Sequence, residues 1–191
     1  MASPDLADVA KAVATAPLRS FRGPVWRVHW RGVQPTDWSL ALRTSGRYHR
    51  GLDLFRPDQT WPALYTSLEP EIAIWEMVRR SAARSLAYLA NNLLSELEVE
   101  LTRVLDLSDP GVVGLTATDL TGPEHAVCQE LAAAAWARGA EALLVPSAAL
   151  PGSNLVILPS NLQSPASLRF VRSLELPLDR MSPPPHNTSQ S

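Results

Sequence analysis

The sequence is poor in the residues that form covalent or metal cross-links. It has a single cysteine, Cys128, in 191 residues, so a disulfide framework within the chain is excluded. Its four histidines are His29, His49, His125 and His186, and together with Cys128 they do not form the set of four closely spaced ligands that a structural zinc site needs. We therefore expect a fold that depends on its apolar core and holds no metal.

Long apolar runs and net charge are also scarce. No stretch of about eighteen uncharged apolar residues occurs, and residues 1–16 contain acids and lack the apolar run of a secretory signal. We therefore expect a cytoplasmic protein without a membrane partner. The formal charge is −2, from 17 basic and 19 acidic residues, so no overall positive field attracts nucleic acid. A ribonuclease-like function is disfavoured on that ground.

Lysine is nearly absent as well. Lys11 is the only lysine, and all other cations are arginines. A GC-rich genome is a sufficient explanation of that bias. The functional alternative is that some arginines bind phosphate through two parallel hydrogen bonds.

The 46% of hydrophobic residues suits one globular domain, and local patterns predict its elements. Helical spacing or capping residues predict helices over residues 5–16, from an N-cap at Ser67, over about 83–94, and over 124–137 with Gly139 as C-cap glycine. Alternation or short apolar runs predict strands over residues 25–31, 63–66, 99–107, 142–145, 155–158 and 168–176.

The order of these elements predicts an α+β domain, because it lacks the regular β-α-β alternation of a doubly wound sheet. No G-x-G-x-x-G, Walker or G-x-S-x-G motif occurs. Residues 32–62 show few periodic signals, which is typical of a functional loop. From Ser182 onward the composition predicts a disordered tail.

Two basic segments are candidates for anion binding. Arg27 lies on the polar face of a strand flanked by tryptophans, where a solvated arginine is the plainer interpretation. The segment Ser45–Gly51 places Arg47 and Tyr48 between glycines, which allow close approach of a ligand to the backbone. Tyr48 would stack on a planar ring. An ordinary basic loop is the alternative.

Four further polar residues lie within or beside predicted elements. Tyr65 ends a strand, and Glu76 lies in the following helix, where a carboxylate in apolar surroundings would stabilise a developing cation. The alternative for Glu76 is an ion pair with an arginine three or four residues later. Ser147 follows a buried strand and Asn154 opens the next, although such residues often only satisfy a turn.

The order of these signals resembles the RES family, named for its Arg, Glu and Ser residues. The resemblance covers roughly residues 22–176. The segments that carry it are Trp26-Arg27-Val28, Ser45-Gly46-Arg47-Tyr48-His49-Arg50-Gly51, Tyr65-Thr66-Ser67, Ala73-Ile74-Trp75-Glu76, Val145-Pro146-Ser147 and Asn154-Leu155-Val156. Ser45 replaces the family's first glycine, and His49 replaces its usual asparagine.

The resemblance implies a fold similar to ADP-ribosyltransferase toxins, with a mixed or antiparallel sheet and flanking helices. It also implies a toxin that cleaves the nicotinamide–ribose bond of NAD+, with water, phosphate or a protein side chain as acceptor, under control of an Xre-like antitoxin. A catalytically inactive interaction module is the alternative. The implied boundaries are an N-terminal helix and lead-in over residues 1–21, a RES domain over 22–180 and a disordered tail over 181–191.

The site residues take their expected roles from the same reaction. We expect Glu76, Arg27 and Ser147 to be catalytic. We expect Arg47, Tyr48, Tyr65 and Asn154 to bind NAD+, with no metal involved.

Overall fold

A computed structural model describes residues 4–80 and 86–178. The strands are β1 (Leu18–Trp30), β2 (Leu64–Ser67), β3 (Asn92–Asp106), β4 (Ala142–Pro146), β5 (Ser153–Ile157) and β6 (Ser167–Glu175). The α-helices are α1 (Leu6–Thr15), α2 (Pro70–Arg80), α3 (Ala117–Thr121) and α4 (Ala126–Ala137). Short 3-10 turns span Ser39–Leu42, Pro57–Gln59, Leu86–Leu89, Pro110–Val113 and Pro159–Asn161.

The strands form one mixed sheet whose pairings close on themselves. The order is β1-β2-β5-β4-β3-β6, and β1 also pairs with β3, so five strands make a closed circuit with β6 outside it. All pairs are antiparallel except β3 with β4. The junction between β1 and β2 consists of one residue pair, Trp26 opposite Ser67. This architecture confirms the predicted α+β class.

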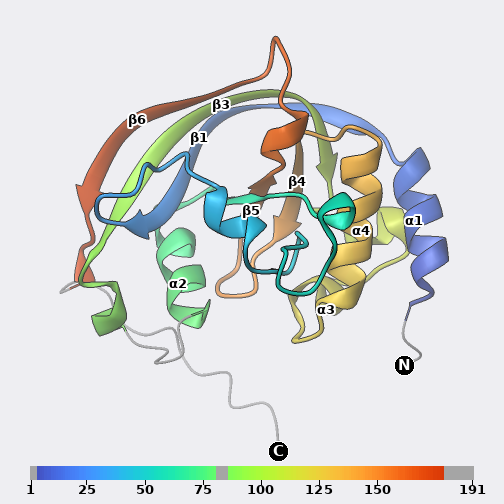
Figure 1. Cartoon of the computed structure of the whole chain (residues 1–191), viewed down its shortest axis with the longest axis horizontal. Helices are drawn as coiled ribbons and strands as arrows, with labels where there is room; N and C mark the ends of the chain where they lie inside the picture. The colour runs from blue at the N-terminus through green and yellow to red at the C-terminus, as the bar shows by residue number, and fades with distance from the viewer. Residues whose placement is uncertain (1–3, 81–85, 179–191) are drawn as a thin grey trace, which may run out of the picture.

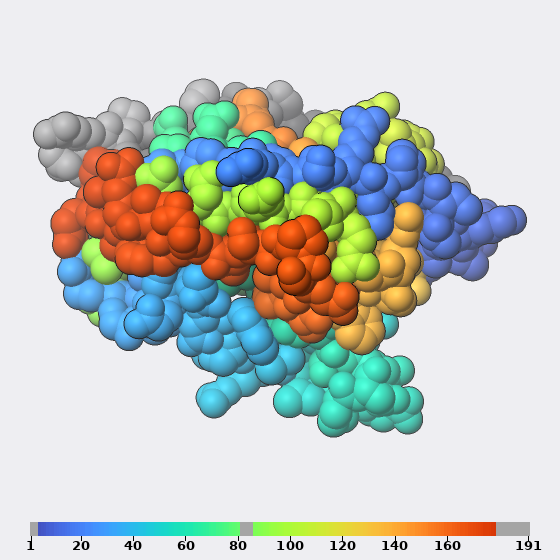
Figure 2. Space-filling view, turned by 90° about the horizontal axis from the view of Figure 1, so that it is seen from above, coloured from blue at the N-terminus to red at the C-terminus, as the bar shows by residue number. Residues whose placement is uncertain are grey.

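The three long strands form an arch over the rest of the molecule (Figure 1). β1 pairs with β3 from Leu18 opposite Leu105 to Trp30 opposite Asn92, and β6 pairs with the other edge of β3. Seen from above, the three strands lie side by side across the outer face (Figure 2). β1 is therefore held along its whole length, which fixes every side chain that it directs inward.

Helices cover the sheet at its two ends (Figure 1). α1 and α4 pack together at one end, where Val9, Val13, Leu131 and Ala135 belong to one buried cluster. At the other end α2 buries Ile74, Trp75 and Val78 in a cluster with Val28 and Leu94 of the long strands. α2 is thus fixed against β1, and the candidate carboxylate Glu76 leaves the other side of the helix, where it contacts Ser147 and Asn154.

Local sequence explains where these helices begin and end. Asp5 caps α1 by accepting a hydrogen bond from the Ala7 N–H at 2.9 Å. Arg138 donates to the carbonyl oxygens of Val13 and Ala16, which satisfies the other end of α1. Gly139 follows α4 with φ of +81°, as predicted for a C-cap glycine.

Three sequence predictions need correction. β1 starts at Leu18 rather than Val25, and its predicted polar face is not solvated, because His29 is 4% exposed whereas Trp30 is 40% exposed. Ser67 does not cap α2; it ends β2 and donates to the Asn154 Oδ1 at 2.6 Å. The predicted helix over 83–94 gives way to a 3-10 turn at Leu86–Leu89 and to β3, while residues 81–85 lie outside the described part.

The last of these corrections has a tertiary cause. Asn92, Leu93 and Leu94 pair with β1 on one side, and the two leucines also pair with β6 on the other. Hydrogen bonding on both edges outweighs the helical preference of a leucine-rich stretch. The inward positions predicted for Val99, Leu101 and Val104 are confirmed, since all three are fully or almost fully buried.

Candidate active site

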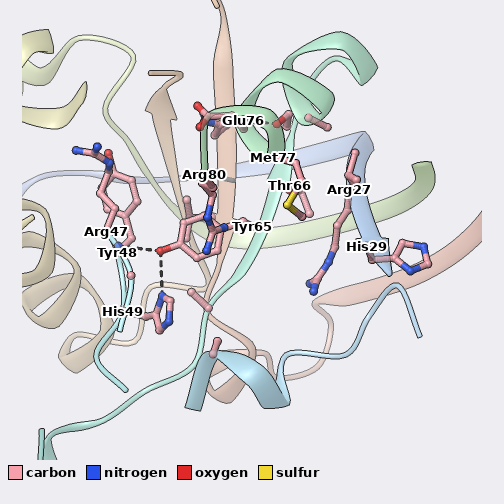
Figure 3. Close-up of a pocket in the computed structure, with 18 of the residues that line it drawn as sticks. Arg27, His29, Arg47, Tyr48, His49, Tyr65, Thr66, Glu76, Met77 and Arg80 are labelled. Carbon is pink, nitrogen blue, oxygen red and sulfur yellow. Dashed lines mark hydrogen bonds between the residues drawn. The ribbon is translucent and has the colours of Figure 1, made fainter. Parts of the chain in front are cut away.

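One large cavity opens between the arch and α2. Its volume is about 850 Å³, and its lining comes from the end of β1, from residues 33–49, from β2, from α2 and from the β4–β5 region. Figure 3 shows side chains from these separate segments directed toward a common space. Residues 32–62 show little regular structure beyond two 3-10 turns, as predicted, and their first half forms one wall.

Glu76 provides the carboxylate of this cavity. Its Oε1 accepts hydrogen bonds from the Ser147 hydroxyl at 2.6 Å, the Asn154 amide at 2.8 Å and the Ala148 N–H at 2.9 Å. Its Oε2 has only a 3.4 Å contact with the Arg79 Nε. The side chain is 17% exposed. One oxygen is thus fixed by three donors, and the other retains capacity to accept a hydrogen bond from a ligand.

The same contacts keep Glu76 ionised. Burial alone raises the pKa of this carboxyl, but the hydrogen bonds from Ser147 and Asn154, the charge of Arg79 and the Ala148 N–H together outweigh it, so the net pKa lies below the ordinary 4.5. A group of this kind does not act as a general acid near neutral pH. It supplies a fixed negative charge in a partly water-excluded site.

Arg27 supplies a buried cation on the β1 wall. Its Nη2 donates to the Asp37 carbonyl oxygen at 2.9 Å, and its Nη1 is buried without a hydrogen-bond partner. Burial, and then the charge of Arg80, lower the pKa of Arg27 to about 10 despite the opposing effect of Asp37. A buried guanidinium nitrogen without an acceptor is costly. An anionic ligand in the cavity would remove that cost.

Arg80 is a second cation that the sequence analysis did not assign to the site. It lies one helical turn after Glu76, and its guanidinium stands 4.9 Å from the centre of the Tyr65 ring. In the described part of the chain it has no carboxylate partner within salt-bridge distance. The spacing of four residues from Glu76 would have identified it, because residues i and i+4 share a helix face.

Arg47 and Tyr48 form the opposite wall, and both are anchored from behind. The Arg47 Nη1 and the Tyr48 hydroxyl each donate to the Leu120 carbonyl oxygen, at 3.1 and 3.2 Å. The Arg47 Nη2 is buried without a partner. Tyr48 is 3% exposed and belongs to the apolar core, so its contacts are those of a wall residue more than of a ring that stacks on a ligand.

Tyr65 and His49 connect the loop to β2. The His49 Nε2 lies 2.7 Å from the Thr44 carbonyl oxygen, which can only accept, so this nitrogen carries the proton. Burial lowers the pKa of His49, and the Nδ1 of the neutral ring therefore accepts a hydrogen bond from the Tyr65 hydroxyl at 3.0 Å. The Tyr65 oxygen accepts from the Tyr48 N–H at 2.9 Å (Figure 3). Histidine at position 49 thus has a structural role in holding the loop.

His29 is another lining residue that the sequence analysis left unassigned. Its Nδ1 donates to the Trp30 carbonyl oxygen at 3.1 Å, and its Nε2 accepts from Ser95 at 2.7 Å. Burial lowers the pKa of His29, which favours this neutral form. Ser95 in turn contacts the Ser173 hydroxyl at 2.7 Å. The chain of polar contacts ties β1, β3 and β6 together behind the cavity.

The structure therefore brings the predicted site residues to one place. Six of them line the cavity, and Ser147 contacts it through Glu76. Their catalytic and binding roles remain predictions. Within residues 4–80 and 86–178, no three His, Cys, Asp or Glu side chains gather in a way that would hold a metal ion. The same ranges contain no helix both long and apolar enough to cross a bilayer.

Comparisons with known proteins cover the same segment. The family model for the RES domain matches residues 24–179. The chain is 30% identical over 149 residues to a Mycobacterium tuberculosis (strain ATCC 25618 / H37Rv) protein named Probable NAD(+) phosphorylase Rv3189, over 75% of this chain and 68% of that protein. It is similar in fold to a chain in the crystal structure of the M. tuberculosis MbcT–MbcA toxin–antitoxin complex. The TM-score is 0.74 at 22% identity, over 90% of this chain and 93% of that one.

Proposed function

Since the chain belongs to the RES domain family, we propose that it cleaves the nicotinamide–ribose bond of NAD+. The observation that carries this proposal is the pairing of an ionised, mostly buried carboxylate with bare guanidinium nitrogens around one cavity. The name of the 30% identical relative supports the same reaction class. NAD+ enters as substrate, and the proposal involves no metal.

The chemistry needs charges of both signs at separate points. When the bond between ribose C1′ and the pyridinium nitrogen breaks, its electron pair stays on nitrogen and nicotinamide leaves neutral, while positive charge develops on the ribose as in glycoside cleavage. The Glu76 carboxylate stabilises that charge or holds a ribose hydroxyl through Oε2. Arg27 binds the pyrophosphate through its bare Nη1.

The remaining predicted residues position these two groups. Ser147 and Asn154 fix the carboxylate through their hydrogen bonds to Oε1. Arg47 presents its unpaired Nη2 from the opposite wall. Tyr65, with a pKa raised to about 12 by burial, stays a neutral phenol and offers its ring as an apolar surface beside the ligand.

For the acceptor we propose inorganic phosphate. An oxygen of phosphate would attack C1′ to form ADP-ribose 1″-phosphate, with a phosphate proton lost to solvent. Three features support phosphate over water: the name of the relative, the bare nitrogens of Arg27 and Arg47, and Arg80 without a carboxylate partner in the described residues. These cations exceed what one pyrophosphate requires.

We also propose a protein partner. The solved structure with the same fold is a toxin–antitoxin complex, and an antitoxin segment that covers the cavity mouth would exclude NAD+. An Xre-like antitoxin, a cytoplasmic location and a toxic outcome for the cell belong to the same proposal.

The test uses the purified chain with NAD+ in buffers with and without phosphate. Chromatography follows free nicotinamide, and mass spectrometry separates ADP-ribose 1″-phosphate from ADP-ribose. We expect nicotinamide release that rises with phosphate concentration. Product without phosphate would replace phosphorolysis by hydrolysis. No release in either buffer, from protein that is folded by circular dichroism, would favour an inactive interaction module.

A further inference from the structure

The cavity has an aromatic rim that the proposed chemistry does not use. Trp30, Trp38 and Tyr88 all line the cavity and remain 37–41% exposed. Trp30 and Tyr88 meet edge to face, with ring centres 5.7 Å apart and planes at 72°. Exposed apolar side chains that gather at a groove mark a site where a ligand or a partner binds, and aromatic rings prefer to stack on other flat rings. We call these three residues the aromatic rim.

The strand register places this rim far from the carboxylate. Glu76 is bonded to Asn154, which is bonded to Ser67, and Ser67 lies opposite Trp26 in the sheet. Trp30 is four residues further along β1, and four residues of strand span about 13 Å. The rim and the carboxylate therefore occupy opposite ends of one wall.

Arg27 lies between these two ends. It follows Trp26 directly, and its Nη2 is bonded to the carbonyl oxygen of Asp37, the residue before Trp38. Along β1 the order of positions is thus Trp26 beside the carboxylate network, then Arg27, then Trp30, and side chains from both faces of this strand end border the cavity. A dinucleotide has the same order of parts: a reacting ribose, a pyrophosphate and a second base.

We propose that the aromatic rim is the adenine subsite, in which the adenine ring stacks on Trp30 or Tyr88. This assignment rests on the proposed cleavage of NAD+, because that reaction fixes the nicotinamide ribose at Glu76 and directs adenine toward the distant rim. Stacking recognises the flat face of a base and needs no base-edge hydrogen bonds. The rim therefore accepts other purines in place of adenine.

The experiment isolates the base from the phosphate. Calorimetric titrations with AMP and with ribose 5-phosphate compare two ligands that share a phosphate and differ in adenine. We expect the wild-type chain to bind AMP roughly 5- to 100-fold more tightly, and Trp30→Ala to lose most of that ratio. Trp30→Phe keeps a ring and should retain most of it. Phe170→Ala, which removes a 46% exposed ring on β6 outside the cavity, should leave the ratio unchanged.

Thermal unfolding of each variant checks the fold, and Tyr88→Ala provides a second change on the 3-10 turn should Trp30→Ala unfold. Equal affinity of the wild type for the two ligands, or a ratio that survives both alanine variants, overturns the assignment and leaves the rim to a protein partner.

Turnover separates this inference from the proposed function. For Trp30→Ala we expect the KM for NAD+ to rise by a similar factor with little change in kcat, because the rim is remote from the reacting bond. If the wild-type chain binds AMP in a way that depends on Trp30 but releases no nicotinamide, the proposed function is overturned and the adenine subsite stands. If Trp30→Ala releases nicotinamide with an unaltered KM for NAD+, the adenine subsite is overturned and the proposed function stands.

Discussion

Replacing Glu76 by glutamine removes one negative charge and little else. The Gln Oε1 can still accept from Ser147, Ala148 and Asn154, which now bond to Glu76 Oε1. Its Nε2 replaces the oxygen that faces the Arg79 guanidinium at 3.4 Å, so one attraction becomes a weak repulsion. We expect the variant to fold, with a melting temperature lower by about 2–4 °C for a loss of about 1 kcal/mol.

The effect on turnover follows from the charge that the reaction creates. A unit negative charge about 4 Å from a unit positive charge contributes about 4 kcal/mol at an effective dielectric constant of about 20. Because the Glu76 side chain is only 17% exposed, water screens this attraction partially. The remaining 3–4 kcal/mol correspond to roughly a 10²- to 10³-fold fall in kcat.

The assay is nicotinamide release at saturating NAD+ and phosphate. Glu175→Gln is the matched control, because that carboxylate is 74% exposed and pairs with Arg31 outside the cavity. We expect the control to turn over at the wild-type rate. If folded Glu76→Gln retains more than a tenth of wild-type kcat, the role assigned to the carboxylate is wrong.

Three further results are expected. Because the pKa of Glu76 lies below 4.5, the carboxylate stays ionised down to that pKa. In a pH series, kcat should therefore begin to fall only below pH 4.5. A fall in kcat centred above pH 4.5 would contradict the hydrogen-bonded geometry of Glu76. Arg27→Met should raise the KM for NAD+ roughly 10- to 100-fold. The melting temperature should not fall, because the change removes a buried cation whose pKa burial lowers to about 10. An unchanged KM would exclude pyrophosphate binding by Arg27. Glu141→Ala should cost about 2–3 kcal/mol in urea unfolding and spare turnover per folded molecule, because the buried carboxylate accepts from the Thr102 N–H at 2.6 Å and the Arg103 N–H at 3.1 Å; a cost under about 0.5 kcal/mol would show that these N–H groups find other acceptors.

Local patterns predicted the elements that are stable on local grounds. α4 has an alanine-rich sequence and a C-cap glycine with positive φ, and the short apolar runs at β4 and β5 are central strands. The start of β3 was missed because its leucines are set by pairing with β1 and β6. Such long-range hydrogen bonding leaves no periodic signal in the segment itself.

The candidate site also contains residues that the sequence predicted and residues that only the fold brings together. Arg27, Glu76 and Ser147 were predicted through the order of their motifs, and the Glu76–Ser147 hydrogen bond at 2.6 Å shows that two of them meet. Arg80 could have been found from its spacing to Glu76. Trp30 and Tyr88 could not, because their contact depends on how a 3-10 turn returns to the end of β1.

The junction between β1 and β2, which consists of a single residue pair, should differ in rigidity between the ligand-free and the ligand-bound protein. On one side of Trp26 opposite Ser67 the chain supplies Arg27, and on the other it supplies Asn154 and, through it, Glu76. A ligand that contacts both sides links β1 to β5 and α2 across this junction, where the strand circuit is held by a single residue pair. Ligand binding should therefore slow amide hydrogen exchange first at the β1–β2 junction. The rigidity of the closed sheet then depends in part on the ligand that it holds.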